Sequence, residues 1–578
     1  MRTISTDVLV VGCGPTGLTA ATALATHGVA NIAISRYPGT ANTPRAHITN
    51  RRTMEVFRDL GIESRIKDVG YSLSWLHNNL FATSLAGMEI ARYKSYGASA
   101  DRRSDYAAAS PCEAINCLQH VMEPVLLAAA QERGADVRFS TELVHIEQTP
   151  ESVRAKVVER ETGAEYVVEA PYVIGADGAR SRIAEQLGFQ FEGQAGLKGM
   201  VTNWLEVDLT QYVAHRPGVI YWIAEPGRFD QAFGSGSFAN VRPWDEWMLM
   251  HPWDADELPS ESDVVDRVRR AIGDPNVPIK VKAITKWYVN NVVATEYRKG
   301  RVFLAGDAAH RHPPSGGLGT NTSVQDAFNL AWKLAWVIKG KAGEGLLDSY
   351  QPERQPVGAH VVERAIQSFH NMASFVEALG LRKDQSADEG WAVLSELYED
   401  SPRGAQRREI LAKAIEQQKY RSNALGVELG QRYESPAVVD DGTPFPAPLR
   451  DPELYYHATT HPGAYLPHAW IEHERVQIST LDLAGHGGFS LIVGVGGNPW
   501  AQAAEKVSAA LGIELPVYPI GLRCDYDDVT SEWAAVREVG DHGAILVRPD
   551  RHIAWRSMDL LDGPADKLEA ALRQVLGL

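Results

Sequence analysis

Residues 301–340 hold the residue types that could bind a flat, negatively polarised ligand. An apolar run at 302–305 predicts a buried strand, and Gly306 and Asp307 turn the chain directly after it. Apolar residues at spacings of three and four over 323–338 predict an amphipathic helix. Backbone N–H groups at 319–322 would then point at the ligand, assisted by the helix dipole. The same pattern also fits an ordinary strand-loop-helix connection.

The N-terminal region carries a glycine pattern typical of dinucleotide binding. Gly12, Gly14 and Gly17 form GxGxxG between an apolar strand predicted at 7–11 and a helix that runs to about Thr26. The first glycine permits the turn, the second lets the backbone approach a pyrophosphate, and the third lets the helix pack on the strand. Glycines that only pack a helix are the structural alternative.

Two features further along bear on the same nucleotide. The second predicted strand, 32–35, ends at Ser35 and Arg36, where a carboxylate usually binds a ribose, so the Ser35 hydroxyl must serve instead. Arg45 could bind a phosphate through two hydrogen bonds.

His47 could act as a base because an imidazole ionises near neutral pH. A structural or surface histidine is the alternative for that position.

A second acidic turn follows an apolar run at 172–176. Asp177 could hold sugar hydroxyls, and Arg180 and Arg182 could serve a phosphate or structural ion pairs. Alternatively, Asp177 and Gly178 only form a β-turn ahead of the next helix.

The stretch 199–286 is rich in aromatic residues with an alternating pattern. This predicts an antiparallel sheet with one face over an apolar ligand, and a plain aromatic core is the alternative. Arg242 places a cation among these residues. The aromatic residues are Tyr221, Trp222, Phe229, Phe233, Phe238, Trp244, Trp247 and Trp253.

A chain of 578 residues is too long for one core, and its pattern predicts an α/β protein of several domains. We expect a discontinuous Rossmann-like nucleotide-binding domain, an inserted domain with a mixed or antiparallel sheet for the substrate, a helical segment and a final α/β domain. The nucleotide-binding domain should comprise 1–75, 101–198 and 287–350, and the inserted substrate domain 76–100 and 199–286. The helical segment should be 351–435 and the final α/β domain 436–578. The proline-rich stretch 436–452 predicts a linker.

Composition narrows the class of partner. A net charge of −16 argues against nucleic acid or an anionic membrane, because both need a basic binding face. The sequence has no run of about eighteen apolar residues that would span a membrane. The four cysteines show neither CxxC nor metal-ligand spacing, so we expect reduced thiols, a cytoplasmic location and no metal site.

The three turns together are far more specific than any one of them. With GxGPxG at 12–17, DGARSR at 177–182, GDAAH at 306–310, PRAHITN at 44–50 and HRHPPSGGLGTNTSVQDAFNLAWKL at 310–334, the chain resembles the single-component flavoprotein aromatic hydroxylases. These belong to the para-hydroxybenzoate hydroxylase fold family. The chain looks most like their subgroup of substituted-phenol ortho-hydroxylases. The resemblance implies FAD, with NADH or NADPH as reductant, and a homodimer or higher homo-oligomer. It also implies a thioredoxin-like C-terminal domain, which without CxxC would be structural or dimer-forming.

The resemblance also implies roles for individual residues. Asn116 departs from the family, because a related hydroxylase carries an acidic residue there, which puts a hydrogen-bond relay through this point in doubt. The FAD-binding residues would be Gly12, Gly14, Pro15, Gly17, Ser35, Arg36, Arg45, Gln119, Asp177, Asp307, Pro314, Gly319, Thr320 and Asn321. The substrate pocket would include Asn116, Trp222, Tyr288 and Pro313. The catalytic residues would be His47 and Arg242.

The implied reaction is ortho-hydroxylation of a substituted phenol to a catechol by O₂, through a flavin C4a-hydroperoxide. The ring must be electron-rich, as a phenolate is. A free phenol has a pKa near 10, so under about one per cent of it is ionised at neutral pH. A base such as His47 would raise that fraction and contribute about 10²- to 10⁴-fold.

Three other functions compete with this one. A flavin oxidoreductase could act on an aromatic or polyketide-like substrate without oxygen insertion. A halogenase of this fold would carry a WxWxIP signature, which the sequence lacks, and a flavin-binding scaffold would not be an enzyme at all. The glycine-rich stretch 494–499 does not fit a second GxGxxG. We therefore expect NAD(P)H to bind transiently over the FAD domain.

Overall fold

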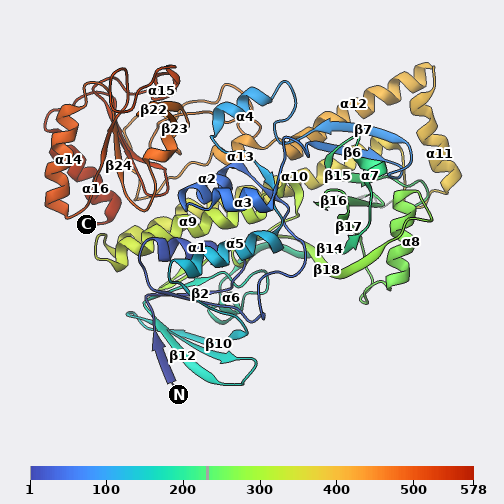
Figure 1. Cartoon of the computed structure of the whole chain (residues 1–578), viewed down its shortest axis with the longest axis horizontal. Helices are drawn as coiled ribbons and strands as arrows, with labels where there is room; N and C mark the ends of the chain where they lie inside the picture. The colour runs from blue at the N-terminus through green and yellow to red at the C-terminus, as the bar shows by residue number, and fades with distance from the viewer. Residues whose placement is uncertain (1, 229–233) are drawn as a thin grey trace.

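The computed structural model describes residues 2–228 and 234–578. Phe229 and Phe233, two of the aromatic residues considered above, lie outside the described residues. Two long helices, α9 (Gly319–Ile338) and α10 (Tyr350–Leu379), run through the middle of the molecule. Figure 1 shows the C-terminal domain at one end of this pair and a large sheet at the other.

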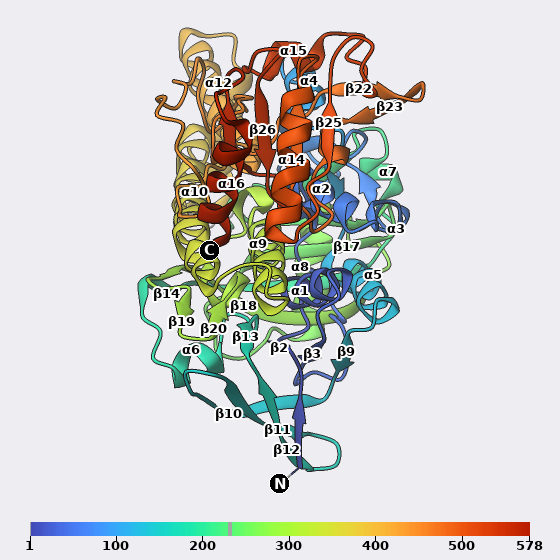
Figure 2. The ribbon, with the colours of Figure 1, turned by 90° about the vertical axis from the view of Figure 1, so that its left-hand side faces the viewer.

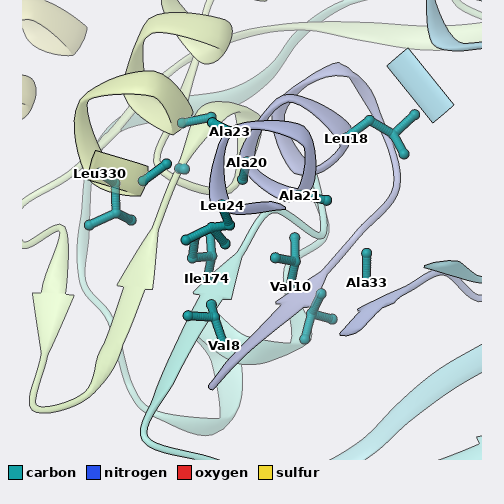
Figure 3. Close-up of a cluster of buried hydrophobic side chains, with 14 of the residues drawn as sticks. Val8, Val10, Leu18, Ala20, Ala21, Ala23, Leu24, Ala33, Ile174 and Leu330 are labelled. Atoms are coloured by element: carbon teal, nitrogen blue, oxygen red, sulfur yellow. The ribbon is translucent and has the colours of Figure 1, made fainter. Parts of the chain in front are cut away.

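The nucleotide-binding half is built on a six-stranded sheet of order β19-β20-β13-β2-β3-β9. All pairs are parallel except β19 with β20, and every residue of β2 and β3 is buried, as expected for a sheet covered on both faces. Apolar residues of α1 and α9 pack over β2 and β13 (Figure 3). The strands are Arg298–Lys299 (β19), Val302–Leu304 (β20), Tyr172–Gly175 (β13), Val8–Val11 (β2), Asn31–Ile34 (β3) and Asp136–Arg138 (β9), and the helices are Pro15–Thr26 (α1) and Gln119–Glu132 (α5).

A second sheet of this half, of order β1-β12-β11-β10, lies at the end of the molecule that carries the N-terminus (Figure 2). Its strands are Arg2–Ser5 (β1), Glu165–Ala170 (β12), Val153–Glu159 (β11) and Thr141–Gln148 (β10).

The large sheet has eight strands in the order β21-β18-β14-β17-β16-β15-β6-β7. Tyr221, Phe238 and Trp247 have no accessible surface and pack against α8 (Glu261–Ile272), so for these three the aromatic core is the correct interpretation. Trp222 belongs to the cluster on the opposite face of the sheet, which packs on α10 and α12 (Pro402–Ser422). The strands are His310–Arg311 (β21), Lys280–Ala294 (β18), Phe191–Glu206 (β14), Glu246–Pro252 (β17), Gly236–Arg242 (β16), Gly218–Ile223 (β15), Asn78–Ala82 (β6) and Glu89–Lys94 (β7).

The segment after α10 is helical and comprises α11 (Ala387–Ser395), α12 (Pro402–Ser422) and α13 (Leu425–Leu429). The proline-rich stretch after it has no helix or strand, but it is not a free linker. Asp441 forms an ion pair of 2.6 Å with Arg556, and the Val439 N–H donates to the Ala554 carbonyl. The stretch is therefore fixed to the C-terminal domain.

The C-terminal domain has a four-stranded mixed sheet of order β25-β24-β26-β27. Strand β23 (Val476–Ser479) is followed directly by a 3-10 turn (Thr480–Leu483). Phe489 makes edge contacts with Trp332 and Trp336 of α9, which joins this domain to the nucleotide-binding half. The elements are Val517–Pro519 (β25), Ser490–Val493 (β24), Ala544–Val547 (β26), Ile553–Ser557 (β27), Asn498–Leu511 (α14) and Pro564–Leu576 (α16). None of the helices described is long and apolar enough to cross a membrane.

Candidate active site

The three turns singled out in the sequence meet at the carboxyl ends of β2, β13 and β20. Gly12 has a φ of 112°, and a Cβ placed there would lie 2.0 Å from the Ala176 carbonyl oxygen. A Cβ on Gly306 would lie 2.4 Å from the Thr16 Oγ1. Both contacts exclude any side chain, and they bring the two acidic turns against the N-terminus of α1.

The N-terminus of α1 has the geometry that a pyrophosphate requires. A Cβ on Gly17 would lie 1.8 Å from the Gly12 carbonyl oxygen, so the third glycine allows close packing of helix on strand. Around Gly14 the backbone is open, because the nearest atom to a Cβ there is the Glu123 Oε1 at 3.9 Å. Pro15 occupies the first helical position, where its missing N–H costs no hydrogen bond. An anionic group can therefore approach the free N–H groups of this helix end.

Two carboxylates stand beside this helix end. Desolvation by neighbouring groups raises the pKa of Asp307, yet the residue is exposed, so its carboxylate is accessible to a ligand. The Asp177 Oδ2 accepts a hydrogen bond from the Ile183 N–H at 3.2 Å, while its Oδ1 is buried without a partner. The Asp177 side chain therefore stabilises its turn, which agrees with the structural alternative for this residue. Its Oδ1 can still accept a hydrogen bond from a ligand.

The start of α9 is tied to the segment that carries His47. The Asn321 Oδ1 accepts from the Asn50 N–H at 2.9 Å, and its Nδ2 donates to the Ile48 carbonyl at 2.9 Å. The helix starts at Gly319, four residues before the predicted start, because the Thr322 N–H already donates to the Leu318 carbonyl. The amides of 319–321 therefore have no carbonyl within the helix and are free to meet a ligand edge.

Arg45 and Gln119 also come together, although 74 positions separate them (119 − 45). The Gln119 N–H donates to the Arg45 carbonyl at 2.9 Å, and the Gln119 side chain donates to Glu123. Glu123 is buried and accepts a second hydrogen bond from the Ala41 N–H. Burial raises the pKa of Glu123, and the positive charge of Arg45 lowers it in part. This polar group lies at the N-terminus of α1.

His47 is half-buried and lies directly before Ile48. Its carbonyl accepts from the Cys117 N–H at 2.9 Å, beside the pairing of Ile48 with Asn116. Burial lowers the pKa of His47 to about 4, Asn116 raises it and the charge of Arg421 lowers it further. The imidazole is therefore neutral at pH 7, and its Nδ1 is buried without a hydrogen-bond partner. It has the protonation state of a base.

The wall opposite His47 is aromatic and apolar. Trp222 stacks on Phe81 with ring centroids 6.2 Å apart, and the Arg421 guanidinium carbon lies 4.3 Å from the Trp222 ring centroid. Tyr93 belongs to the same buried cluster as Trp222, and Pro313 is buried in the loop before α9. A flat aromatic substrate fits a wall of this kind.

The residues present fit FAD. An open helix N-terminus, carboxylate acceptors at two turns and free amides at a second helix start match its pyrophosphate, its hydroxyls and its flavin edge. No group of three or more His, Cys, Asp or Glu residues that could hold a metal occurs in the part of the chain that the structure describes.

Family models match most of the chain. One described as FAD binding domain matches residues 5–365, and one described as aromatic-ring hydroxylase, C-terminal, matches residues 459–578. The chain belongs to the FAD-dependent aromatic-ring hydroxylases. The resemblance inferred from the motifs is thereby confirmed, as is the α/β fold with its FAD-binding domain.

Named relatives of this hydroxylase cover its whole length. 2,4-Dichlorophenol 6-monooxygenase of Delftia acidovorans is 43% identical, over 100% of this chain and 99% of the relative. Phenol 2-monooxygenase of Pseudomonas sp. (strain EST1001) is 40% identical, over 99% of this chain and 92% of the relative. The crystal structure of the flavin-dependent monooxygenase PieE in complex with FAD and substrate is 46% identical, with a TM-score of 0.97 over 100% of both chains.

Several expected site residues of the hydroxylase have their side chains engaged elsewhere. Arg242 is half-exposed and forms an ion pair of 2.8 Å with Asp245, and Tyr288 is half-exposed near Lys286. Their roles in the substrate site stay predictions. The remaining expected residues, Ser35, Arg36, Pro314 and Thr320, lie at the end of β3 or in the loop and first turn of α9.

The sequence did not point to Glu123 or Arg421. Glu123 sits inside a helix with an ordinary pattern, and only its low exposure and its contact with Gly14 mark it. Arg421 is one of many charged residues of α12. Its position next to Trp222 and His47 follows from the packing of α12 on the large sheet.

Proposed function

We propose that this hydroxylase is an NAD(P)H- and O₂-dependent monooxygenase that converts a substituted phenol to a catechol by ortho-hydroxylation. The observation that carries the proposal is the state of His47. Its imidazole is half-buried and neutral at pH 7, and the Asn321 hydrogen bonds to Ile48 and Asn50 hold its segment next to the first turn of α9. Full-length likeness to proteins named as phenol and dichlorophenol monooxygenases supports the substrate class.

The protein's part in the reaction is to bind, orient and hold protons. When bound, FAD would take a hydride from NAD(P)H and supply an activated oxygen from O₂. The α1 N-terminus would hold its pyrophosphate, Asp307 its ribityl hydroxyls, and the amides of 319–321 the polar edge of the flavin. Trp222 offers the face on which the substrate ring rests.

His47 accepts the proton of the substrate hydroxyl. The phenolate has more electron density in its ring than the neutral phenol, so it reacts faster with an electrophilic oxygen. Asn116 cannot take the proton onward as a carboxylate could, because an amide has no basic site. The proton therefore leaves His47 by another route, and no relay through Asn116 is part of the proposal.

A single-turnover experiment tests the proposal. The purified yellow protein is reduced anaerobically with NADH or NADPH and mixed with O₂ and phenol, 2-chlorophenol or 2,4-dichlorophenol. We expect close to one catechol for each reduced flavin. Reduced-flavin oxidation without any oxygenated product would support the oxidoreductase alternative instead. A preparation that cannot be reconstituted with FAD would overturn both.

The proposal places the enzyme in the cytoplasm as a homo-oligomer. All four cysteines are free in the structure, and three of them are buried, which suits a reducing compartment. Light scattering of the purified holoenzyme measures the oligomeric state, and a monomer would contradict this part. A thioredoxin-like C-terminal domain stays part of the proposal as a structural unit.

A further inference from the structure

The last turn of α12 lies between the large sheet and the loop that leads into α9, and it contacts both. The Tyr96 N–H donates to the Ser422 carbonyl at 3.2 Å, and the Tyr93 hydroxyl lies 3.2 Å from the Ser422 Oγ. On the other side, a Cβ on Gly316 would lie 3.0 Å from the Arg421 carbonyl oxygen. This helix end therefore closes the space between the substrate wall and the flavin-side loop.

Arg421 is half-buried, and its surroundings differ from those of several fully buried arginines that the structure describes. Four of them, Arg52, Arg354, Arg548 and Arg551, each hold a carboxylate at 3.0 Å or less. Arg421 has no carboxylate partner among the described residues, and the ionisable groups that act on it are the hydroxyls of Tyr93 and Tyr96. Its guanidinium is partly covered, and its one ring contact is with Trp222. A desolvated cation without an anion is costly, so an anionic partner is expected at this place.

We propose that Arg421 binds the phenolate oxygen of the substrate, so that the enzyme selects phenols that ionise in its site. This inference rests on the proposed function and deepens it. The substrate O–H bond breaks, its proton passes to the His47 imidazole, and the oxygen keeps the electron pair and pairs with the guanidinium. No electron is transferred in this step. Guanidinium and phenolate then share hydrogen bonds strengthened by charge.

The charge of Arg421 also acts on His47. It adds to the effect of burial in lowering the pKa of His47, so the imidazole carries no proton before a phenol arrives. Once the phenolate forms, its negative charge offsets that effect and favours the imidazolium. One cation thus favours the neutral base before binding and stabilises the anion afterwards.

The other titratable groups around Arg421 do not replace the missing carboxylate. Tyr93 and Tyr96 face it from β7 and the turn that follows, and burial raises the pKa of both, so they stay neutral at pH 7. Glu428 of α13 acts on Tyr96, and burial raises its pKa to about 7. The charge of Glu428 is balanced by Arg51 and Arg52. Arg421 is therefore the cation that remains for a ligand.

A binding titration tests the inference without turnover. The oxidised holoenzyme is titrated with 4-nitrophenol at pH values from 5.5 to 8.5, and difference absorbance reports phenol and phenolate separately. The wild type should bind the phenolate, with an apparent pKa of the bound phenol at least about one unit below that of the free phenol. Arg421→Met should lose at least about tenfold in phenolate affinity and that pKa shift, since one unit corresponds to a factor of ten. Arg421→Lys should keep part of both.

Lys419→Met is the matched control. It removes a cation from the same helix turn, but Lys419 pairs with Glu416 at the surface, so phenolate binding should not change. A wild type that binds 4-nitrophenol only in its neutral form would overturn the inference, whatever the variants do. So would an Arg421→Met protein with wild-type phenolate affinity. If Arg421→Met does not retain FAD, Arg421→Gln takes its place in the titration.

The titration separates the two proposals. Phenolate binding through Arg421 in an enzyme that forms no catechol would overturn the proposed function alone. Catechol formation by an Arg421→Met enzyme with unchanged phenolate titration would overturn this inference alone.

Discussion

Glu353 of α10 and Arg548, directly after β26, form an ion pair of 2.6 Å in which neither side chain has accessible surface. Lys333 of α9 and Asp550 extend it, at 2.6 Å from Glu353 and 2.7 Å from Arg548. The network joins the C-terminal domain to the two helices that run behind the flavin site. A buried network of this kind is expensive to break, because each lost partner leaves an unbalanced charge.

Arg548→Met should lower the free energy of unfolding by about 3–5 kcal/mol, because Glu353 and Asp550 would keep their charges without the guanidinium. Flavin fluorescence on heating should report earlier release of FAD. Lys413→Met, which removes a surface pair with Glu409, should leave the melting temperature unchanged. An Arg548→Met protein as stable as the wild type would show that the C-terminal domain is not coupled to α10.

Two neighbouring glycines should fail for different reasons. Gly12→Ala forces a side chain onto a φ of 112° and against the Ala176 carbonyl, so both stability and FAD content should drop. Gly14→Ala meets open space, so the apoprotein should melt as the wild type does, while FAD binding weakens by about tenfold or more because the methyl group occupies the approach to the helix N–H groups. Differential scanning fluorimetry with and without FAD separates the two effects. Equal loss of apoprotein stability in both variants would contradict this.

His47→Gln should lower the rate of catechol formation by about 10²- to 10⁴-fold while FAD content stays normal. Burial lowers the pKa of His47 to about 4, so the histidine is in its base form throughout the physiological range. The kcat/KM of the wild type should therefore show no inflection from His47 between pH 6 and 8. Stopped-flow rates over that range are the measurement. A variant with the wild-type rate would remove His47 from the mechanism.

His251 predicts a loss of stability in mild acid. It is buried in β17, and burial lowers its pKa from the ordinary 6.5 to about 4. Between pH 6.5 and 4, His251 binds a proton in the unfolded chain but not in the folded protein. Its contribution to the free energy of unfolding is therefore complete above pH 6.5 and is lost as the pH falls toward 4. The loss for this residue is about 3 kcal/mol.

Urea unfolding of the wild type and His251→Gln at several pH values between 4.5 and 7.5 tests this. The variant should show a shallower decline of unfolding free energy with falling pH, by up to one proton in slope. Parallel curves for the two proteins would contradict the assignment to His251.

Local sequence patterns predicted the strands, turns and helices whose conformation is set by residues close to them in the chain. The strand-turn-helix around Gly12, Gly14 and Gly17 and the parallel strands of the first sheet follow from apolar runs and glycines that no other residue can replace. The wider pattern also located Asp177, Asp307 and the first turn of α9.

Other parts of the site depend on packing between distant elements. Alternating aromatic residues show that a sheet exists, but not which face meets α8 and which meets α12, so Trp247 and Trp222 look alike in the sequence. Arg421 carries no mark of its own, because its place beside Trp222 results from where α12 ends. Arg242 is paired with Asp245, three residues away, and its role at the substrate stays a prediction.

Two hydrogen bonds join Asn321 at the start of α9 to the segment that carries His47, so these two parts of the site form one rigid unit. The wall that carries Trp222 is instead assembled from separate elements, β15 and the end of α12. Substitutions in that wall can enlarge or reshape the chamber without moving the proton acceptor relative to the flavin. Divergence within this family can therefore explore new aromatic substrates by altering one wall, while the chemistry is inherited unchanged. Exchanging residues 402–430 between relatives should transfer ring-size preference before it affects catalytic competence.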